Sequence, residues 1–351
     1  MIRPAEAALC LALLLLMIAT PEGQAQPRRR FQPREMTQAE KVELEQLGSR
    51  GIWVHDPSTI VKCKDTYWIF CTGRGVPSYT SQDLKTWNRG PAVLTKPPAW
   101  QTEAVPKNRG TGYWAPDVLF HKDKYLLFFS VSTFGANTSA IGVTTNKTLD
   151  PDDPEYSWTE PRLVIKSDPS CNYNAIDPGV VVDQEGKLWM SFGSFWNGIQ
   201  LVELDPDTGT RIAPDSPVTT LADYDSIEAP HIYHHDGYYY LFLNWGICCR
   251  GTRSTYNIRV GRSKKITGPY LDQEDKDMTL GGGTLLLETE GNFVGPGHPG
   301  IWQEADKHYL GMHFYNGAMN GVSQYAIRPL TWDEDGWPSV ELPSPTPDPG
   351  D

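Results

Sequence analysis

The chain has little basic charge, no closely paired cysteines of the metal-binding kind and no long apolar segment. Its 351 residues include 31 Lys and Arg against 43 Asp and Glu, which gives a formal net charge of −12. We therefore expect neither nucleic acid nor an anionic membrane surface as a partner. Because no Cys-x-x-Cys pair occurs, a structural zinc site is not expected. The apolar run at residues 9–19 is too short to span a membrane.

Residues 1–25 have the organisation of a secretory signal peptide. Arg3 provides a positive start, residues 9–19 form the apolar core, and the sequence GQA at 23–25 suits a cleavage site. Cys10 lies inside the apolar core rather than after it, which argues against a lipoprotein anchor. We therefore expect a secreted monomer that acts outside the cell or in the periplasm.

Cysteine is scarce after this segment. Five cysteines remain, an odd number that cannot pair completely within the chain, and their wide spacing is not that of a disulfide framework. The adjacent Cys248 and Cys249 are compatible with a vicinal disulfide or with two small apolar side chains in a loop or strand.

From about residue 51 onward, the chain repeats one pattern five times. Each repeat has a polar or acidic start, an apolar strand, a tight polar turn and an aromatic strand. The starts lie 61, 60, 51 and 70 residues apart when they are counted from Asp56, Asp117, Asp177, Glu228 and His298. Repeats of this length with several short strands predict an all-β fold, a five-bladed β-propeller, whereas a β-sandwich would not repeat one motif at one place.

A polar dipeptide marks the hairpin turn that we expect in each repeat. These dipeptides are Lys64-Asp65, Lys122-Asp123, Glu185-Gly186, Asp236-Gly237 and Asp306-Lys307. We predict that residues 51–340 form the propeller as the catalytic domain. An N-terminal extension at 26–50, with a peripheral helix over 38–47, would precede it, and a proline-rich tail at 341–351 would follow.

Three of the repeats place a carboxylate directly before an apolar strand, in the segments HDPSTIV, NAIDPGVVV and SIEAPHIY. Each segment taken alone is also ordinary turn chemistry, because the residue before a proline favours extended geometry. In a propeller, however, the first strand of every blade lines the central channel, so Asp56, Asp177 and Glu228 would meet in one cavity. Cleavage of a glycosidic bond usually needs two carboxyl groups, and the sequence therefore predicts a glycosidase.

The chain resembles glycoside hydrolase family 43, specifically its five-bladed propeller α-1,5-L-arabinanases. The resemblance covers residues 53–338 and rests on HDPS (55–58), WAPDV (114–118), STFGANTSAIG (132–142), NAIDP (174–178), SFGSFWNGI (191–199), IEAPHI (227–232), CCRGTRSTYNIRVGRS (248–263), GPGH (295–298) and IRPLTWDEDGWP (327–338). It implies hydrolysis of α-1,5-L-arabinofuranosidic bonds in arabinan with inversion of configuration, in the first place by an endo-arabinanase.

The same resemblance implies a role for each charged position. Asp56 would be the general base with His55 supporting it, Glu228 the general acid, and Asp177 the residue that orients the acid and raises its pKa. In an inverting enzyme the acid and the base lie about 6.5–9.5 Å apart. His298 would bind a cation, expected to be Ca²⁺, whose other ligands are waters. Judged from the residues alone, a single His in a Gly-Pro loop is more often a hydrogen-bonded loop residue.

Substrate contacts are implied for seven residues, which are Trp114, Phe134, Gly135, Asn174, Ser194, Phe195 and Trp196. For the aromatic residues Trp114, Phe134 and Trp196, packing between blades is the alternative. Three other functions are compatible with the same scaffold: an exo-acting α-L-arabinofuranosidase, a β-xylosidase, and a propeller that binds sugars without cleaving them. In every case the expected partner is a polysaccharide or an oligosaccharide.

Overall fold

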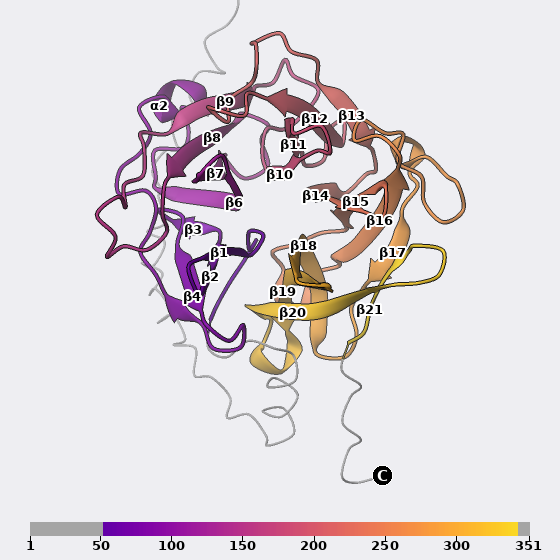
Figure 1. The fold of residues 1–351 in the computed structure, drawn as a ribbon. Helices are drawn as coiled ribbons and strands as arrows, with labels where there is room; N and C mark the ends of the chain where they lie inside the picture. The colour runs from indigo at the N-terminus through magenta and orange to yellow at the C-terminus, as the bar shows by residue number, and fades with distance from the viewer. Residues whose placement is uncertain (1–51, 343–351) are drawn as a thin grey trace, which may run out of the picture. The chain divides into compact units, whose positions relative to one another are not determined.

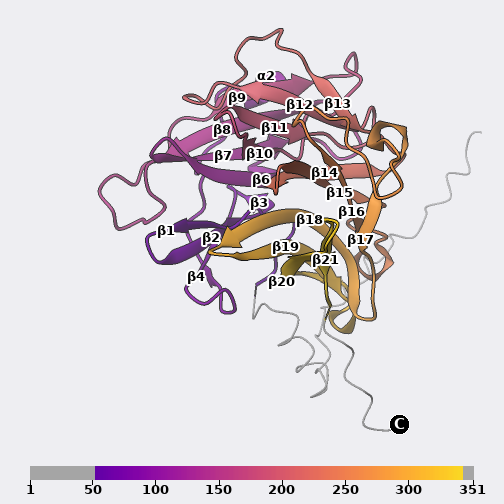
Figure 2. The ribbon, with the colours of Figure 1, turned by 45° about the vertical axis from the view of Figure 1, so that its right-hand side comes forward.

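The repeated strand–turn–strand pattern forms antiparallel sheets, which the computed structural model describes for residues 52–342. Figures 1 and 2 show the five sheets around a common centre, as the five-bladed propeller predicted from the sequence. The first strands of neighbouring blades contact one another: β6 contacts β1 and β10, and β14 contacts β10 and β18. The start of every repeat therefore lies near the centre of the molecule, where the cavity described below is built.

Each blade is formed by consecutive strands. Blade 1 contains β1 (Val61–Cys63), β2 (Thr66–Phe70), β4 (Ser78–Ser81) and β5 (Asn88–Arg89). Blade 2 contains β6 (Gly112–His121), β7 (Lys124–Val131), β8 (Ser139–Asn146) and β9 (Arg162–Ser167), with β3 (Gly73–Arg74) added beside β6. Blade 3 contains β10 (Gly179–Val182), β11 (Leu188–Phe192), β12 (Ile199–Leu204) and β13 (Thr219–Ala222).

Blades 4 and 5 follow the same plan. Blade 4 contains β14 (Ile227–His235), β15 (Tyr238–Trp245), β16 (Asn257–Ser263) and β17 (Thr284–Leu287). Blade 5 contains β18 (Phe293–Glu304), β19 (Lys307–Asn316), β20 (Val322–Trp332) and β21 (Pro338–Val340). The short helices are α2 (Gln101–Ala104), η1 (Gly251–Arg253), η2 (Met278–Leu280) and η3 (Gly317–Met319).

Four of the five expected hairpin turns lie at the predicted dipeptides, between the paired first and second strands of their blades. The fifth was wrong by one residue. Lys307 pairs with Glu304, so the turn of blade 5 is formed by Ala305 and Asp306. Ala305 has a left-handed φ of 53°, and this conformation closes the two-residue turn.

The apolar core is divided among the five interfaces between blades, one hydrophobic cluster to each. Because side chains alternate along a strand, one strand supplies two interfaces. On β15, Tyr239 and Leu241 pack toward blade 3, whereas Tyr240 and Phe242 pack toward blade 5. The interface between blades 5 and 1 closes the ring through side chains, among them the Tyr67 hydroxyl, which donates to Glu304 at 2.7 Å.

Several sequence-based predictions lie outside the described residues. These are the signal peptide at 1–25, the extension at 26–50 with its helix, and most of the tail at 341–351. Within residues 52–342, no helix is long and apolar enough to cross a membrane.

One backbone feature recurs at the start of every blade. At the start of each blade, one residue other than glycine directly precedes a proline and has a left-handed φ. We call these five the head residues: Asp56 (49°), Ala115 (42°), Asp177 (58°), Ala229 (56°) and His298 (57°). A residue before proline normally adopts extended geometry, and a left-handed residue other than glycine costs about 1–3 kcal/mol. The surrounding structure must therefore hold all five in place.

A closed ring of hydrogen bonds holds the head residues. Each head residue donates its backbone N–H to a side chain of the preceding blade. In the order given above, the acceptors are His313 Nδ1 at 3.1 Å, Thr72 Oγ1 at 2.8 Å, Ser130 Oγ at 3.0 Å, Asp177 Oδ2 at 3.2 Å and Asn244 Oδ1 at 2.7 Å. The ring includes the step from blade 5 to blade 1, so it connects all five blades at the centre.

The structure corrects the alignment of the second and fourth repeats. Their head residues are Ala115, not Asp117, and Ala229, not Glu228. The buried carboxylate of Asp117 accepts the N–H of Thr59 on Oδ1 and the N–H of Val180 on Oδ2, both at 2.9 Å. Asp117 therefore ties blade 2 to blades 1 and 3, and it is a structural carboxylate.

Candidate active site

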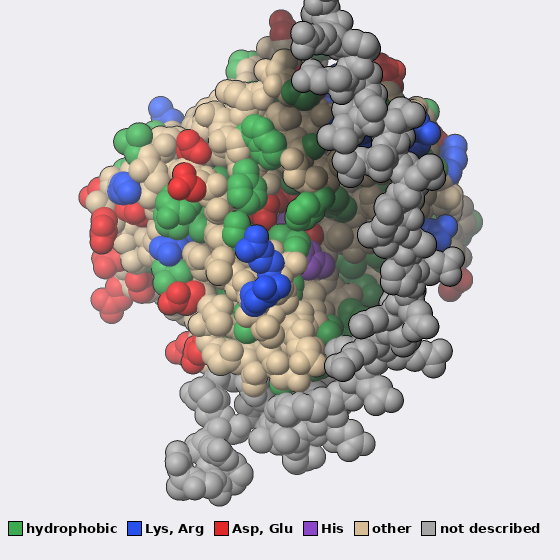
Figure 3. Space-filling model, turned by 180° about the vertical axis from the view of Figure 1, so that it is seen from behind, with side chains coloured by type: hydrophobic (Ala, Val, Ile, Leu, Met, Phe, Trp, Pro, Cys, Tyr) green, Lys and Arg blue, Asp and Glu red, His purple; other side chains and the backbone are tan. Residues whose placement is uncertain are grey.

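One cavity of about 1020 Å³ brings together ten of the eleven site residues named in the sequence analysis. They are the carboxylates Asp56, Asp177 and Glu228 and all seven expected substrate contacts, namely Trp114, Phe134, Gly135, Asn174, Ser194, Phe195 and Trp196. Figure 3 shows acidic and histidine side chains in a hollow that hydrophobic side chains and a small basic group border. The eleventh residue, His298, does not line this cavity.

Asp56 is held by donors on one of its two carboxylate oxygens. Oδ2 accepts the Thr72 hydroxyl at 2.6 Å and lies 2.8 Å from His55 Nδ1, so His55 supports Asp56 as the sequence predicts. Oδ1 lies 3.7 Å from both His298 Nδ1 and His313 Nδ1 and makes no hydrogen bond within residues 52–342. Burial opposes ionisation, but His55 above all, with the two further histidines, holds the pKa of Asp56 well below its usual range. Asp56 is therefore a carboxylate with one free oxygen.

The pKa of Glu228, on β14, is shifted in the opposite direction to that of Asp56. Oε1 accepts a hydrogen bond from the Tyr256 hydroxyl, and Oε2 accepts one from Ser194 at 2.7 Å. Burial, with a contribution from the charge of Asp56, raises the pKa of Glu228 to about 7, although the Ser194 hydrogen bond opposes the rise. Because hydroxyl groups can donate or accept, Glu228 can carry a proton without losing either contact.

Asp177 supports both the backbone and the ionisation of the site. As a head residue it donates its N–H to Ser130, and its Oδ2 accepts the N–H of the next head residue, Ala229. Burial raises the pKa of Asp177 well above its ordinary value, and the charges of Glu228 and Asp56 add to the rise. The Asp177–Glu228 pair therefore retains a proton near neutral pH.

The expected substrate contacts fall into two groups. Phe134 is 82% exposed and Trp196 is 47% exposed, so they are not packed between blades but stand at the cavity with open faces. By contrast, Asn174 is buried and its Oδ1 accepts the Ser139 hydroxyl at 2.7 Å, and the Ser194 hydroxyl is bound to Glu228. The exposed aromatic faces are suited to sugar rings, whereas the polar groups are already oriented by the protein.

His298 is a buried head residue behind the carboxylates. Burial lowers its pKa, which keeps the imidazole in the neutral form that can bind a metal. Within residues 52–342, no group of three or more possible ligand side chains for a metal includes His298. The donor set therefore fits a cation that takes one nitrogen from the protein and its other ligands from water. A hard cation such as Ca²⁺ prefers oxygen, so His298 alone would not select it.

Four residues that orient the carboxylates were missed in the sequence analysis. They are Thr72, Tyr256, His313 and Tyr315. Tyr256 lies inside one of the long motifs, and this position was a usable signal. His313 and Tyr315 are two residues apart on β19 and so share one face of the strand, but this spacing is common in any sheet.

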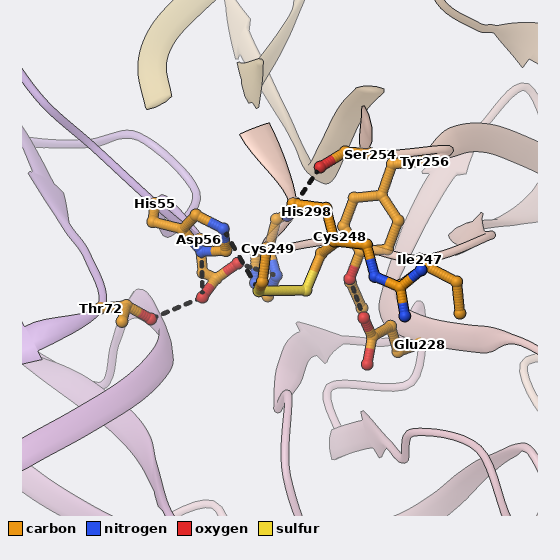
Figure 4. The surroundings of a disulfide bond; sticks show 12 residues. His55, Asp56, Thr72, Glu228, Ile247, Cys248, Cys249, Ser254, Tyr256 and His298 are labelled. Carbon is orange, nitrogen blue, oxygen red and sulfur yellow. Dashed lines mark hydrogen bonds and ion pairs between the residues drawn. A yellow bond between two sulfur atoms is a disulfide. The ribbon is translucent and has the colours of Figure 1, made fainter. Parts of the chain in front are cut away.

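The adjacent cysteines form a disulfide, which decides between the two states compatible with the sequence. Both Cys248 and Cys249 line the cavity, and Figure 4 shows their bond between the group of His55 and Asp56 and the Glu228 side chain. The other cysteines within residues 52–342, Cys63, Cys71 and Cys171, are free.

Known proteins similar to this chain are enzymes that the sequence resemblance also indicated. An extracellular exo-α-(1→5)-L-arabinofuranosidase of Cellvibrio japonicus is 42% identical over 84% of this chain and 88% of its own length. An extracellular endo-α-(1→5)-L-arabinanase of Bacillus subtilis is 39% identical over 86% of this chain and 92% of its own.

Solved structures agree with this result. The structure of Cellvibrio cellulosa α-L-arabinanase complexed with arabinohexaose superposes with a TM-score of 0.79 at 41% identity, over 83% of this chain and 96% of the other. The sequence model of glycosyl hydrolases family 43 matches residues 52–338 of this chain. The chain therefore belongs to glycosyl hydrolases family 43.

Proposed function

We propose that this glycoside hydrolase cleaves α-1,5-L-arabinofuranosidic bonds within arabinan chains, with inversion of configuration. The observation that carries the proposal is a single cavity in which two carboxyl groups are held in opposite protonation states. Asp56 is ionised, whereas the pKa of Glu228 is about 7. The substrate class is supported by the names of the relatives and by the arabinohexaose bound to a structural neighbour.

In the proposed reaction, Glu228 protonates the leaving oxygen while Asp56 takes a proton from the attacking water. The free Oδ1 of Asp56 is the acceptor for that proton, because Thr72 and His55 already occupy Oδ2. Asp177 acts on the acid in two ways. It anchors the N–H of Ala229, next to Glu228, and because the two buried carboxyl groups repel each other when both are ionised, the Asp177–Glu228 pair keeps a proton that Glu228 can deliver.

Exo action is the second candidate, because the relative that is 42% identical is named an exo-acting enzyme. Linear arabinan digested by the purified protein separates the two modes. Endo action predicts a mixture of oligosaccharides early in the reaction, and exo action predicts one short product from the start. NMR of the first product should show the β-anomer, as expected for inversion. Release of the α-anomer, or no cleavage of arabinan, would contradict the proposal.

We also propose that the protein is exported and acts as a monomer. Two relatives are named extracellular, and residues 1–25 have the pattern of a signal peptide. Expression of the full chain should place a processed protein outside the cytoplasm, and light scattering should give the mass of one chain. An unprocessed cytoplasmic protein would contradict the export proposal, and a dimer mass would contradict the monomer.

We further propose that His298 is the single protein ligand of a cation that stabilises the centre of the propeller, as the resemblance to arabinanases implies. The neutral imidazole and its position 3.7 Å from Asp56 Oδ1 support the proposal. When bound, the cation would supply positive charge near the ionised Asp56.

A further inference from the structure

The Cys248–Cys249 disulfide occupies part of the cavity wall, and the chemistry proposed above does not use it. It lies in the loop between β15 and β16, which also contains η1. Cys249 is exposed and has a left-handed φ of 64°, which is uncommon for a residue other than glycine. A disulfide between adjacent cysteines closes a small ring that contains their shared peptide bond, so it restricts the backbone at this point.

The restricted backbone is hydrogen-bonded toward the catalytic centre. The N–H of Cys249 donates to the Tyr315 hydroxyl at 2.8 Å. The Tyr315 oxygen lies 2.7 Å from His55 Nε2, and His55 Nδ1 lies 2.8 Å from Asp56 Oδ2. Nδ1 of His55 donates to the carboxylate, while Nε2 accepts from the Tyr315 hydroxyl in the neutral ring and donates to it in the protonated ring. In both forms a continuous series of hydrogen bonds connects the backbone of Cys249 to Asp56.

Other contacts also hold the His55 ring and the backbone of Asp56 in place. His55 stacks on His313 with ring centroids 4.2 Å apart, and His313 accepts the N–H of Asp56. Further hydrogen bonds hold the loop on both sides of the disulfide: the N–H of Ile247 donates to Thr255 Oγ1 at 3.0 Å, and the N–H of Arg250 donates to Ser254 Oγ at 3.1 Å. Cys249 Sγ itself lies 3.8 Å from His55 Nε2. A change in the backbone of Cys249 would therefore move the donor that orients Tyr315, and with it the His55 ring.

We propose that the Cys248–Cys249 disulfide is a positioning element for Asp56: it fixes the Cys249 N–H on Tyr315 and thereby sets the orientation of His55 and of the carboxylate. The inference rests on the proposed function, in which Asp56 activates water. The disulfide and Tyr315 are positioning groups here, and they transfer no proton in the reaction.

Reduction of the disulfide in the folded protein tests the proposal. A water-soluble phosphine is oxidised to its phosphine oxide, takes its oxygen from water, and leaves two thiols in place of the S–S bond; mass spectrometry verifies the reduced state. We expect kcat to fall at least about tenfold with KM changed less than about twofold, because a misoriented base loses rate. The loss should be the same on arabinan and on an aryl arabinoside, since both reactions need the activated water.

A double-mutant design decides whether the effect passes through Tyr315. Tyr315→Phe removes the hydroxyl but keeps the disulfide, so it should lower kcat, and reduction should then add little further loss. The Cys248→Ser/Cys249→Ser double variant should match the reduced wild type and should not respond to phosphine. Cys171→Ser, which removes a free cysteine outside the cavity, should keep both the activity and the response to phosphine.

Two results would overturn the inference. Unchanged kcat after verified reduction would show that the disulfide does not position the base. A rise in KM alone, which persists in Tyr315→Phe, would assign the sulfurs to a substrate contact instead. Failure of the proposed function looks different, because the oxidised wild type would then cleave neither substrate.

Discussion

The side chains that surround Glu228 determine which carboxyl group carries the proton. Ser194 donates to the Oε2 atom of Glu228, and this contact stabilises the charged form and lowers the pKa of the group. An enzyme that needs Glu228 protonated loses activity as the pH rises through that pKa, which is about 7.

Ser194→Ala should therefore move the basic limb of the kcat/KM profile to higher pH, because the carboxylate loses a donor and holds its proton longer. The measurement is the pH dependence of kcat/KM on arabinan. Ser132→Ala is the matched control, since Ser132 also lines the cavity but its hydroxyl binds Ser139. A basic limb that stays in place or moves to lower pH in Ser194→Ala would contradict this assignment.

Two substitutions separate the electrostatic effect of Asp177 from its function as a hydrogen-bond acceptor. Asp177→Asn keeps an oxygen for the Ala229 N–H but removes the negative charge, so the pKa of Glu228 should fall and the basic limb should move to lower pH. Asp177→Ala loses both, and it should in addition lower the free energy of unfolding by about 1–3 kcal/mol, because a buried N–H is left unpaired. Equal unfolding midpoints of the two variants in urea would argue against the anchoring role.

At the residue scale, the sequence predicted the site residues that stand in a recognisable motif. It did not predict site residues whose function comes from contacts between distant segments. Asp56, Asp177 and Glu228 each stand before a strand in a recognisable segment, and all three line the cavity. Thr72 carries no comparable signal, since its function comes from the bond across to Asp56. The repeat pattern counts Asp117 and Glu228 as starts, but the backbone conformation identifies Ala115 and Ala229 as the equivalent positions.

At the scale of the strand, the ring of head residues explains how a left-handed residue can precede a proline at the start of every blade. Each strained residue has its N–H bound by the preceding blade, so the strain is balanced by contacts between blades. Blade 3 differs from the rest. In blade 3 the carboxylate of the head residue Asp177 accepts the N–H of the next head residue, Ala229. The nearby Ser194 hydroxyl does not take this place, because it donates to Glu228.

Ser130→Ala tests the ring at a residue that lies outside the cavity wall. The N–H of Asp177 would be left buried without its partner, so we expect the free energy of unfolding to fall by about 1–3 kcal/mol in urea titrations. Ser157→Ala, at an exposed serine, is the control and should change stability by less than about 0.5 kcal/mol. A Ser130→Ala protein as stable as the control would show that the ring contributes no stability.

At the scale of the whole molecule, the propeller brings residues from distant repeats to one centre. The regular repeat length predicted this arrangement from the sequence, because each unit is one blade with its start at the channel. The closure between blades 5 and 1 could not be predicted in the same way. It depends on side chains whose type changes from blade to blade: His313 accepts the head-residue N–H that Thr72 and Ser130 accept in earlier blades, and Tyr67 donates to Glu304.

Removal of the proposed cation tests the role of His298 for the whole propeller. Exhaustive chelation should lower the melting temperature and release a metal that elemental analysis can identify, and added Ca²⁺ should restore the melting temperature. His298→Ala should melt at one temperature with or without chelator. A wild-type protein that holds no metal and melts unchanged after chelation would make His298 a hydrogen-bonded loop residue only.

The central claim is that Glu228 and Asp56 divide acid and base catalysis, and the leaving group of the substrate tests it most directly. The measurement is kcat/KM of Glu228→Ala and Asp56→Ala on arabinan and on an aryl arabinoside whose phenolate leaves without protonation. We predict that Glu228→Ala loses arabinan cleavage by at least about 100-fold but retains most of its rate on the aryl substrate. Asp56→Ala should lose both, with azide restoring the aryl reaction. Equal losses of Glu228→Ala on both substrates, together with an Asp56→Ala protein that still cleaves arabinan, would contradict the claim.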